Sequence, residues 1–419
     1  MPYVGHADRN KTRAPPPPDL DSPSRGDSET ASVATDFSEI LSSANEASLE
    51  DIVKDLLDDM QEKRTSTRLK ALKKVLKILQ TKFLPEIFDS CLITLQSCVS
   101  NGLRSKDTKE AVLSCQLLGL LCITFGQENT PSLFTSYRKS LETIGSDRSK
   151  NSVVRGSALR TLAMITFLGC DDAQALEQIM ALNQSMFKAR DSAVSEAATS
   201  SWGLLASVIL KSTKQSNLMS KYIEKTAPLL LDTLDCKDAE TKQNAGRALA
   251  LISEACARLE GKLEEKDAEV VGEMMDDIID KLEDLATTTN KSQNRKEKAR
   301  QRASFREFLA SVRDGEEAHE SFTIDSNEVE IDGLAKCVQF GELRRWIGVG
   351  FQTHIRDNPL ISDMFGFVLE SLSQGEAREA REDKIYFAKI HSRAKKEKYQ
   401  KRRIKKTQAL VRTDEDVEY

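Results

Sequence analysis

The amino-acid sequence predicts an all-α protein built as an armadillo/HEAT-like helical-repeat solenoid. Charged residues make up 30% of the 419 residues and aromatic residues only 5%, a profile typical of exposed amphipathic helices rather than of a β-sandwich or barrel. Helical periodicity begins at Leu49. Similar pairs of helices then recur about every 40 to 48 residues, which is the period of armadillo and HEAT arrays.

The first part of the chain, residues 1–48, is predicted to be a disordered tail. It combines the proline run Pro15 to Pro18 with Ser, Asp and Thr, and has few large apolar groups to offset the entropy of ordering. It lacks the apolar core of a signal peptide, and no uninterrupted apolar stretch in the chain approaches the ~20 residues of a membrane-spanning helix. We therefore expect a soluble protein that is not secreted.

The repeat array is predicted over residues 49–290. Apolar residues from Leu69 to Leu79 recur at three- and four-residue steps, with lysines on the opposite face. The first helices of the pairs are expected to begin near Ser66, Asp107, Asn151, Asp191 and Asp238. The second helices are expected to begin near Pro85, Pro131 and Pro228. Such an array leaves an extended concave surface without a deep pocket, which suits large partners.

An acidic helix is expected to close the array, with an apolar stripe formed by Val270, Met274, Ile278, Leu282 and Leu285. Residues 291–320 are then predicted as a basic linker or helix, and residues 321–375 as a small C-terminal helical unit. Within this unit we expect a hairpin in SFTIDSNEVEIDG and two helices, Leu334–Val349 and Pro359–Leu372. Residues 376–410 read as a long basic C-terminal helix, and residues 411–419 as an acidic tail.

The basic C-terminal segment is the strongest functional signal. Residues 384–412 contain twelve Lys and Arg and a single acid, Glu397, so their net charge is +11. Because the net charge of the whole chain is −5, the rest of the chain carries −16. A helix ringed by cations has no apolar face for its own protein, which favours an external anionic partner. The predicted RNA-binding residues are Lys384, Lys389, Arg393, Lys395, Lys396, Lys398, Lys401, Arg402, Arg403, Lys405 and Lys406, with Tyr386, Phe387 and Tyr399 as stacking surfaces.

Other interpretations of these cations stay open. The run KKEKYQKRRIKK would also serve as a nuclear-import signal, or the segment could merely increase solubility. A second basic stretch could contact nucleic acid or could be a charged linker. Its candidate residues are Arg295, Lys296, Lys298, Arg300, Arg302 and Arg306.

No catalytic motif is found among the four histidines and the glycine pairs. HExxH, GxSxG and GxxxxGK[ST] are absent, and His354 has no nucleophile near it in the sequence, so a packing or helix-end role is expected. Gly348 and Gly350 lack the third glycine and the preceding strand of a phosphate loop. Asp276 and Asp277 fall on a solvated acidic face. The chain is therefore predicted to be no enzyme and to need no cofactor.

The eight cysteines are scattered, without a CxxC pair or alternation with histidine, so neither a disulfide framework nor a zinc site is expected. This usage favours a reducing compartment. Cys91 and Cys98, like Cys115 and Cys122, are seven residues apart, and each pair is expected on one helical face as small core residues.

Three stretches of the chain resemble the interferon-related developmental regulator family. DDMQEKRTSTRLKALKKVLKILQTKFLPEIF, followed by VLSCQLLGLLCITFG, resembles its N-terminal half. RKEKARQRASFREFL is similar to its QRxxFRxxL element at Gln301, Arg302, Ser304, Phe305, Arg306, Phe308 and Leu309. LRRWIGVGFQTHIRDNPLISDMF is similar to its C-terminal signature at Leu343, Gly348, Gly350, His354, Asn358 and Phe365. The resemblance covers roughly residues 50–406, but no motif aligns over residues 316–333.

The resemblance implies one of two roles. In the first, the protein binds translationally inactive ribosomes, its C-terminal helix enters the RNA-lined mRNA path, and its body occupies tRNA space. In the alternative, it is a nuclear protein-interaction scaffold that acts as a transcriptional co-regulator with chromatin proteins. Either way we expect no small-molecule substrate and no membrane. The expected location is the cytoplasm, with the nucleus as a further site.

Overall fold

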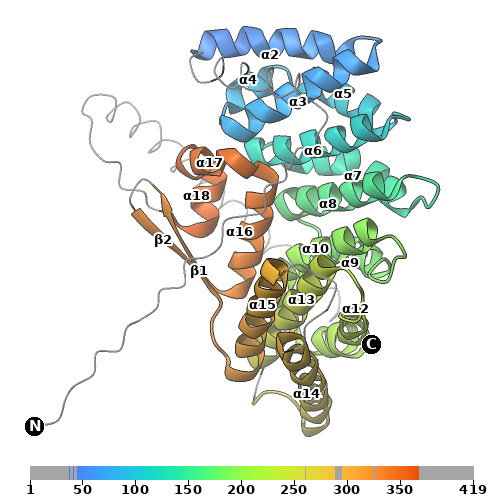
Figure 1. Cartoon of the computed structure of the whole chain (residues 1–419), viewed down its shortest axis with the longest axis vertical. Helices are drawn as coiled ribbons and strands as arrows, with labels where there is room; N and C mark the ends of the chain where they lie inside the picture. Colours follow the sequence, from blue (N-terminus) through green and yellow to red (C-terminus); the bar gives the residue numbers. More distant parts are fainter. Residues whose placement is uncertain are drawn as a thin grey trace, which may run out of the picture. The chain divides into compact units, whose positions relative to one another are not determined.

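The computed structural model describes residues 45–259, 261–287, 295–324 and 327–367, together with Phe37 and Leu41. All of these residues belong to one compact unit. Apart from one antiparallel pair of strands, the regular elements of this part of the chain are helices. Figure 1 shows most of them stacked in two layers, with a further group against one layer. The predicted helical-repeat solenoid is confirmed.

Five long helices form the layer that runs down the middle of Figure 1, which we call the inner layer. They are α3 (Thr65–Thr81), α6 (Thr108–Phe125), α8 (Ser152–Gly169), α10 (Ser192–Ile209) and α13 (Ala239–Ala257). Their first residues are 43, 44, 40 and 47 positions apart, and each helix packs on the next. The side chains of Asp107, Asn151 and Asp238 cap the amides at the starts of α6, α8 and α13.

A second layer of helices, the outer layer, packs on one side of the inner layer. Its helices are α2 (Glu46–Gln61), α4 (Pro85–Ser90), α5 (Leu92–Leu103), α7 (Thr130–Ser146), α9 (Ala173–Gln184), α12 (Ala227–Thr233) and α14 (Glu265–Thr287). Pro85, Pro131 and Pro228 occupy the first turns of α4, α7 and α12, as predicted. Pro85 and Pro131 fit there because the missing amide would have no partner within the helix, whereas Pro228 lies where α12 follows directly on the helical residues 218–226.

The connection between α10 and α12 is irregular. It consists of the 3₁₀ turn η1 (Leu210–Ser212), the short helix α11 (Gln215–Asn217) and the π-helix η2 (Leu218–Thr226). Tyr222 of η2 packs edge-on against Trp202 of α10, with 6.2 Å between the ring centroids. This contact joins the wider π turn to the inner layer.

The core of the array lies between the two layers. Small residues let the inner helices approach closely, and a Cβ at Gly156 of α8 would lie 2.6 Å from the carbonyl oxygen of Ala193. Two segments, Thr108–Phe125 and Ser192–Ser212, are long and apolar enough to cross a membrane, but 72% and 78% of them are buried inside the protein. Burial of this extent identifies both as core helices.

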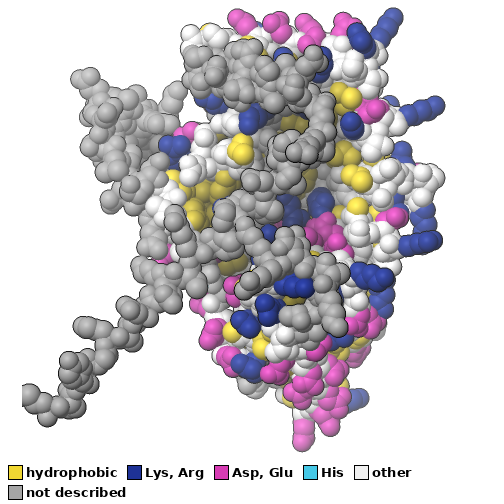
Figure 2. Space-filling model, viewed as in Figure 1, with side chains coloured by type: hydrophobic (Ala, Val, Ile, Leu, Met, Phe, Trp, Pro, Cys, Tyr) yellow, Lys and Arg dark blue, Asp and Glu magenta, His cyan; other side chains and the backbone are white. Residues whose placement is uncertain are grey.

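The acidic helix α14 lies at the end of the array and carries the predicted apolar stripe. Ile278 and Leu282 are buried, whereas Val270, Met274 and Leu285 are only partly covered. The opposite face exposes carboxylates, and Figure 2 shows acidic side chains gathered over this end of the molecule. The stripe therefore packs most tightly toward the C-terminal half of the helix.

One expectation about the cysteines is wrong. Cys91 does not share a helix with Cys98, because it lies at the break between α4 and α5 with φ −114° and ψ 15°. The six-residue α4, which starts at Pro85, ends before the chain reaches α5. Cys115 and Cys122 do lie in one helix, α6, and both are buried.

A C-terminal unit, residues 319–367, lies against the inner layer on the side away from the outer layer (Figure 1). It contains β1 (His319–Ile324), β2 (Asn327–Asp332), α16 (Leu334–Ile347), the 3₁₀ turn η3 (Gly348–Gly350), α17 (Phe351–Asp357) and α18 (Pro359–Phe365). The predicted hairpin is confirmed, with Phe322 opposite Val329. Helix α17 was not predicted. The expected extension of the last helix to Leu372 is wrong, because α18 ends at Phe365, where Gly366 adopts the left-handed conformation that caps a helix.

Aromatic rings form the core of the C-terminal unit. Phe340 of α16 stacks on Phe322 of β1 with 4.8 Å between centroids, and meets the edges of Phe351 and Phe365 at 4.9 and 5.3 Å. Such edge-to-face pairs add specific geometry to the burial of apolar area. The rings thus join the hairpin to α16, α17 and α18.

Candidate interaction surfaces

The main predicted RNA-binding residues, from Lys384 to Lys406, lie outside the residues that the structure describes. The same holds for the aromatic residues Tyr386, Phe387 and Tyr399. Their placement therefore stays a prediction from sequence.

The second basic stretch forms a helix that is packed on the array. Helix α15 (Arg295–Asp314) contacts α13 and α14, so from Arg295 onward it is no linker. Phe305 and Phe308 are buried against Gly246 of α13, where a Cβ would lie 3.0 Å from each ring. The family element QRxxFRxxL is thus explained by packing, because Gln301 and Leu309 are buried as well.

The cations of α15 divide by their position on this helix. Arg300 and Arg306 are exposed, whereas Lys298 and Arg302 are partly covered. The side chains of Arg295 and Lys296 lie outside the described part of the chain. Among the described side chains of this helix three guanidinium groups are exposed, those of Arg300, Arg306 and Arg313, and Arg313 is paired with Asp314. The helix thus offers less free positive charge than its sequence suggests.

The C-terminal signature of the family forms contacts with the carbonyl ends of inner helices. His354 of α17 is fully buried, and its Nε2 lies 2.8 Å from the carbonyl oxygen of Leu79 in the last turn of α3. A carbonyl oxygen can only accept, so Nε2 carries the proton and donates. Burial lowers the pKa of His354, which keeps the ring neutral. The expectation of a packing role for His354 agrees with this geometry.

Asn358 makes the equivalent contact one helix further on. Its Nδ2 donates to the carbonyl oxygen of Ile123 in the last turn of α6 over 3.0 Å, while its Oδ1 accepts the amide of Leu360 and caps α18. The last carbonyl groups of a helix have no partner within that helix. His354 and Asn358 therefore supply donors that α3 and α6 lack.

Gly348 and Gly350 are explained by backbone geometry rather than by phosphate binding. Gly348 ends α16 at φ +64°, in the left-handed region that favours glycine. Gly350 lies against α3 so closely that a Cβ there would overlap the carbonyl oxygen of Gln80. Trp346 packs on Gly119 of α6 in the same way, because a Cβ on that glycine would overlap the indole ring.

Charged and polar side chains extend the interface along α16. The Ser200 hydroxyl of α10 donates to Oε1 of Glu342 over 2.6 Å. Nη1 of Arg345 lies 3.3 Å from Oε1 of Glu196, and Glu196 also forms an ion pair with Arg160 of α8. Burial alone would raise the pKa of Glu342, but Arg345, the Ser200 hydroxyl and Arg160 together lower it. Glu342 is therefore ionised and paired at the centre of the interface.

These contacts change the expectation of an open concave surface. Helix α16 packs on α3, α6, α10 and α13, so the protein's own C-terminal unit covers the face of the inner layer that the sequence suggested for large partners. The prediction was wrong because a solenoid pattern describes contacts between neighbouring repeats only. It does not reveal a segment that folds back from later in the chain.

A basic surface that the sequence analysis did not select lies on α3. From Lys63 to Lys82 the chain contains eight Lys and Arg and no acid. Lys70, Lys73, Lys74 and Lys77 follow the i, i+3, i+4, i+7 spacing of one helical face, which we call the α3 basic face. The available signal was the absence of any acid along this run, which an ordinary solvated helix face seldom shows.

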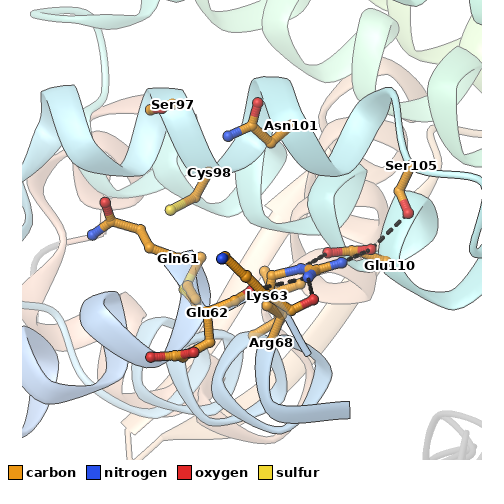
Figure 3. Close-up of a pocket in the computed structure, with 11 residues that line it drawn as sticks. Gln61, Glu62, Lys63, Arg68, Ser97, Cys98, Asn101, Ser105 and Glu110 are labelled. Carbon is orange, nitrogen blue, oxygen red and sulfur yellow. Dashed lines mark hydrogen bonds and ion pairs between the residues drawn. The ribbon is translucent and has the colours of Figure 1, made fainter. Parts of the chain in front are cut away.

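A cleft of about 450 Å³ opens beside the turn between α2 and α3, where Glu62 and Lys63 lie (Figure 3). Arg68 crosses its floor and forms a two-pronged ion pair with Glu110, with distances of 2.5 and 2.9 Å. Its remaining donors bind the carbonyl oxygens of Glu62 and Lys63 and the Thr65 hydroxyl. All five guanidinium donors are therefore used within the protein.

The described residues outside these surfaces show no cluster of side chains that could bind a metal ion. Within this part of the chain, no three His, Cys, Asp or Glu residues lie close enough to hold a metal ion. Asp276 and Asp277 are exposed on α14, as expected. Burial raises the pKa of Cys115 and Cys122 to about 12 each, so neither thiol is ionised near neutral pH.

Comparison with known proteins agrees with the motifs. A family model described as interferon-related developmental regulator matches residues 21–313. Mouse interferon-related developmental regulator 2 is 25% identical over 333 residues, which cover 77% of this chain and 74% of that protein. Human interferon-related developmental regulator 1 is 25% identical over 351 residues, which cover 81% of this chain and 76% of that protein.

Among solved structures, a designed armadillo repeat protein is 13% identical, with a TM-score of 0.40, and the match covers 61% of this chain and 98% of that protein. The match to the family model covers the whole described repeat array and ends within α15. The chain belongs to the interferon-related developmental regulator family.

Proposed function

We propose that this protein is a non-catalytic factor that associates with translationally inactive ribosomes and blocks the mRNA and tRNA path. The observation that carries the proposal is the charge of residues 384–412, twelve Lys and Arg against one acid. Such a segment binds RNA by releasing counterions from phosphates, without needing a specific base sequence. The ribosomal role that family resemblance implies has the same requirement.

The repeat array supports this proposal as a compact body. Its two layers are closed at one end by α15 and along one face by the C-terminal unit. A body of this kind can occupy space that a tRNA would need, while the basic segment contacts ribosomal RNA. The protein would act by occluding the tRNA and mRNA path, and no covalent bond is made or broken.

The alternative role, a nuclear scaffold, would most simply use the inner face to recruit extended peptides. The cover formed by α16 over α3, α6, α10 and α13 counts against that use. Other surfaces of the array would have to bind the nuclear partners. We propose ribosomes as the partner and the cytoplasm as the location, with a nuclear role as the competing hypothesis.

Binding across a range of salt concentrations tests the proposal. The full chain is titrated against purified ribosomal monosomes that lack mRNA, alongside a variant in which Lys395, Lys396, Lys398 and Lys401 are changed to Gln. Each phosphate contact contributes about 0.7 to 0.9 to the slope of log affinity against log salt, so the variant should lose roughly three units. An unchanged slope would remove this segment from the RNA interface.

The proposed helical form of the segment has its own test. Lys398→Pro leaves most of the charge in place but costs about 3 kcal/mol in a helix interior. We expect much weaker monosome binding than for Lys398→Gln, which keeps the helix propensity. Equal binding of the two variants would argue that the segment binds as an extended chain.

A further inference from the structure

The four lysines of the α3 basic face have no acidic partner in the described structure. No carboxylate of the described residues lies within ion-pair distance of Lys70, Lys73 or Lys77. Lys74 lies over the ring of Phe37, 5.1 Å from its centroid, which holds the side chain without neutralising it. Within the described residues the face therefore presents four positive charges without an acidic partner, with Lys70 and Lys73 exposed and Lys74 and Lys77 partly covered.

The acids of the neighbouring helix α2 point elsewhere. Val53, Leu56 and Met60 of α2 are buried, and α2 packs on α3. By the 100° step of a helix, its exposed carboxylates fall on the opposite face. They are Asp51, Asp55, Asp58 and Asp59. Opposite charges on these adjacent helices thus face different directions and do not cancel locally.

The C-terminal unit fixes the position of this face. Gln80, one turn beyond Lys77, donates to the carbonyl oxygen of Trp346 over 3.3 Å, and Leu79 accepts from His354. The buried side of α3 rests on α2 and α6. The four cations therefore lie on a helix held on three sides, and span about 10 Å along its axis at 1.5 Å per residue.

The chemistry of the face favours a phosphate backbone. Lysine is a compact point charge that contacts phosphates without reading bases. A membrane-binding face would also need exposed apolar side chains. The large apolar side chains exposed in the described residues are Ile93, Val153, Val208 and Val349, and none belongs to α3.

We infer that the α3 basic face is a second RNA-binding surface, on the body of the protein and separate in sequence from residues 384–412. The inference rests on the proposed function for its choice of RNA as the partner. It assigns to Lys70, Lys73, Lys74 and Lys77 the contact with phosphates of ribosomal RNA. The C-terminal unit acts there as a support that positions α3.

The test uses the full chain with all four lysines changed to Gln, which preserves helix propensity. A matched control changes Lys139, Lys211, Lys225 and Lys262 to Gln, since these lysines are exposed on separate elements and form no ion pair within the described structure. Both variants lose the same net charge. The salt dependence of binding is measured with purified monosomes, with a fluorescent single-stranded RNA and with phosphatidylserine vesicles.

We expect the α3 variant to lose roughly three units of salt slope on monosomes and RNA, and the control less than one. Equal slopes for the two variants would overturn the inference. Loss of vesicle binding with unchanged RNA binding would also overturn it and make the face a membrane surface. Two half variants, Lys70 with Lys73 and Lys74 with Lys77, should each lose about half of the effect, which guards against a folding defect in the fourfold change.

The two proposals can fail separately. If the Lys395, Lys396, Lys398 and Lys401 variant binds monosomes like wild type while the α3 variant does not, the role of the C-terminal segment is wrong and the α3 surface stands. The reverse result removes α3 from the interface and leaves the proposed function intact.

Discussion

Asn358 donates its side-chain amide to the carbonyl oxygen of Ile123, 235 positions earlier in the chain and 3.0 Å away. The acceptor lies in the last turn of α6, where helix carbonyl groups lack partners within the helix. The Asn358 side chain therefore binds a carbonyl group in the last turn of α6 through its Nδ2, and caps the first turn of α18 through its Oδ1. The fold of the array and the docking of the C-terminal unit are coupled at this residue.

Replacement of Asn358 by Ala should destabilise the protein by about 2 kcal/mol, because it leaves a buried carbonyl unpaired and removes a helix cap. The control is Asn45→Ala, which removes only the exposed cap of α2 and should cost about 1 kcal/mol or less. Urea unfolding measures both. Equal losses would mean that the bond to Ile123 contributes nothing.

Gly350→Ala should loosen the C-terminal unit from α3, because the added methyl group would overlap the carbonyl oxygen of Gln80. Gly341→Ala is the control, since nothing lies within 4 Å of its added Cβ, and in a helix it should stabilise by roughly 0.5–1 kcal/mol. Hydrogen exchange of α16 and α17 should speed up in the first variant only. Unchanged exchange would contradict the close packing at Gly350.

Removal of Arg68 should be far more damaging than removal of a surface partner. Arg68→Ala leaves Glu110, whose pKa the Arg68 hydrogen bond lowers, as a largely buried carboxylate without its ion pair, at a cost of about 3 kcal/mol or more. Lys54→Ala breaks the exposed pair with Glu50 and should change the free energy of unfolding by under about 1 kcal/mol. Similar losses in thermal unfolding would show that the Arg68 network is solvated.

Stability should depend on the protonation of His354. Burial lowers its pKa below the ordinary value of 6.5, so the unfolded chain binds the proton more readily than the folded chain. The free energy of unfolding should then be highest above about pH 6.5 and decrease as the pH falls toward the folded pKa. His354→Gln cannot titrate and should lose this part of the slope. A slope identical to wild type in denaturant titrations would refute the assignment.

Local sequence patterns were sufficient to predict the repeat fold. The apolar spacing in α3 and the caps at Asp107, Asn151 and Asp238 act within a few residues, so helix starts could be predicted closely. The break at Cys91 was missed because no glycine or proline marks it in the sequence. Helix α17 was missed because its seven residues are too few to show a helical periodicity.

The interaction surfaces were harder to predict. His354 and Leu79 are 275 positions apart, and periodicity carries no information about such pairings. The cover of the inner face could therefore not be predicted from the sequence of the array. The α3 basic face was visible as a run without acids, but the larger charge of residues 384–412 dominated the choice of candidates.

Sedimentation of cell extract through a sucrose gradient tests the central claim most directly. Wild-type protein is compared with a chain lacking residues 384–412, in growing cells and in cells whose translation is arrested. We predict wild type in the monosome peak, independent of mRNA, and the deletion variant at the top of the gradient. Wild type that stays at the top under both conditions would contradict a ribosomal function and support the nuclear scaffold.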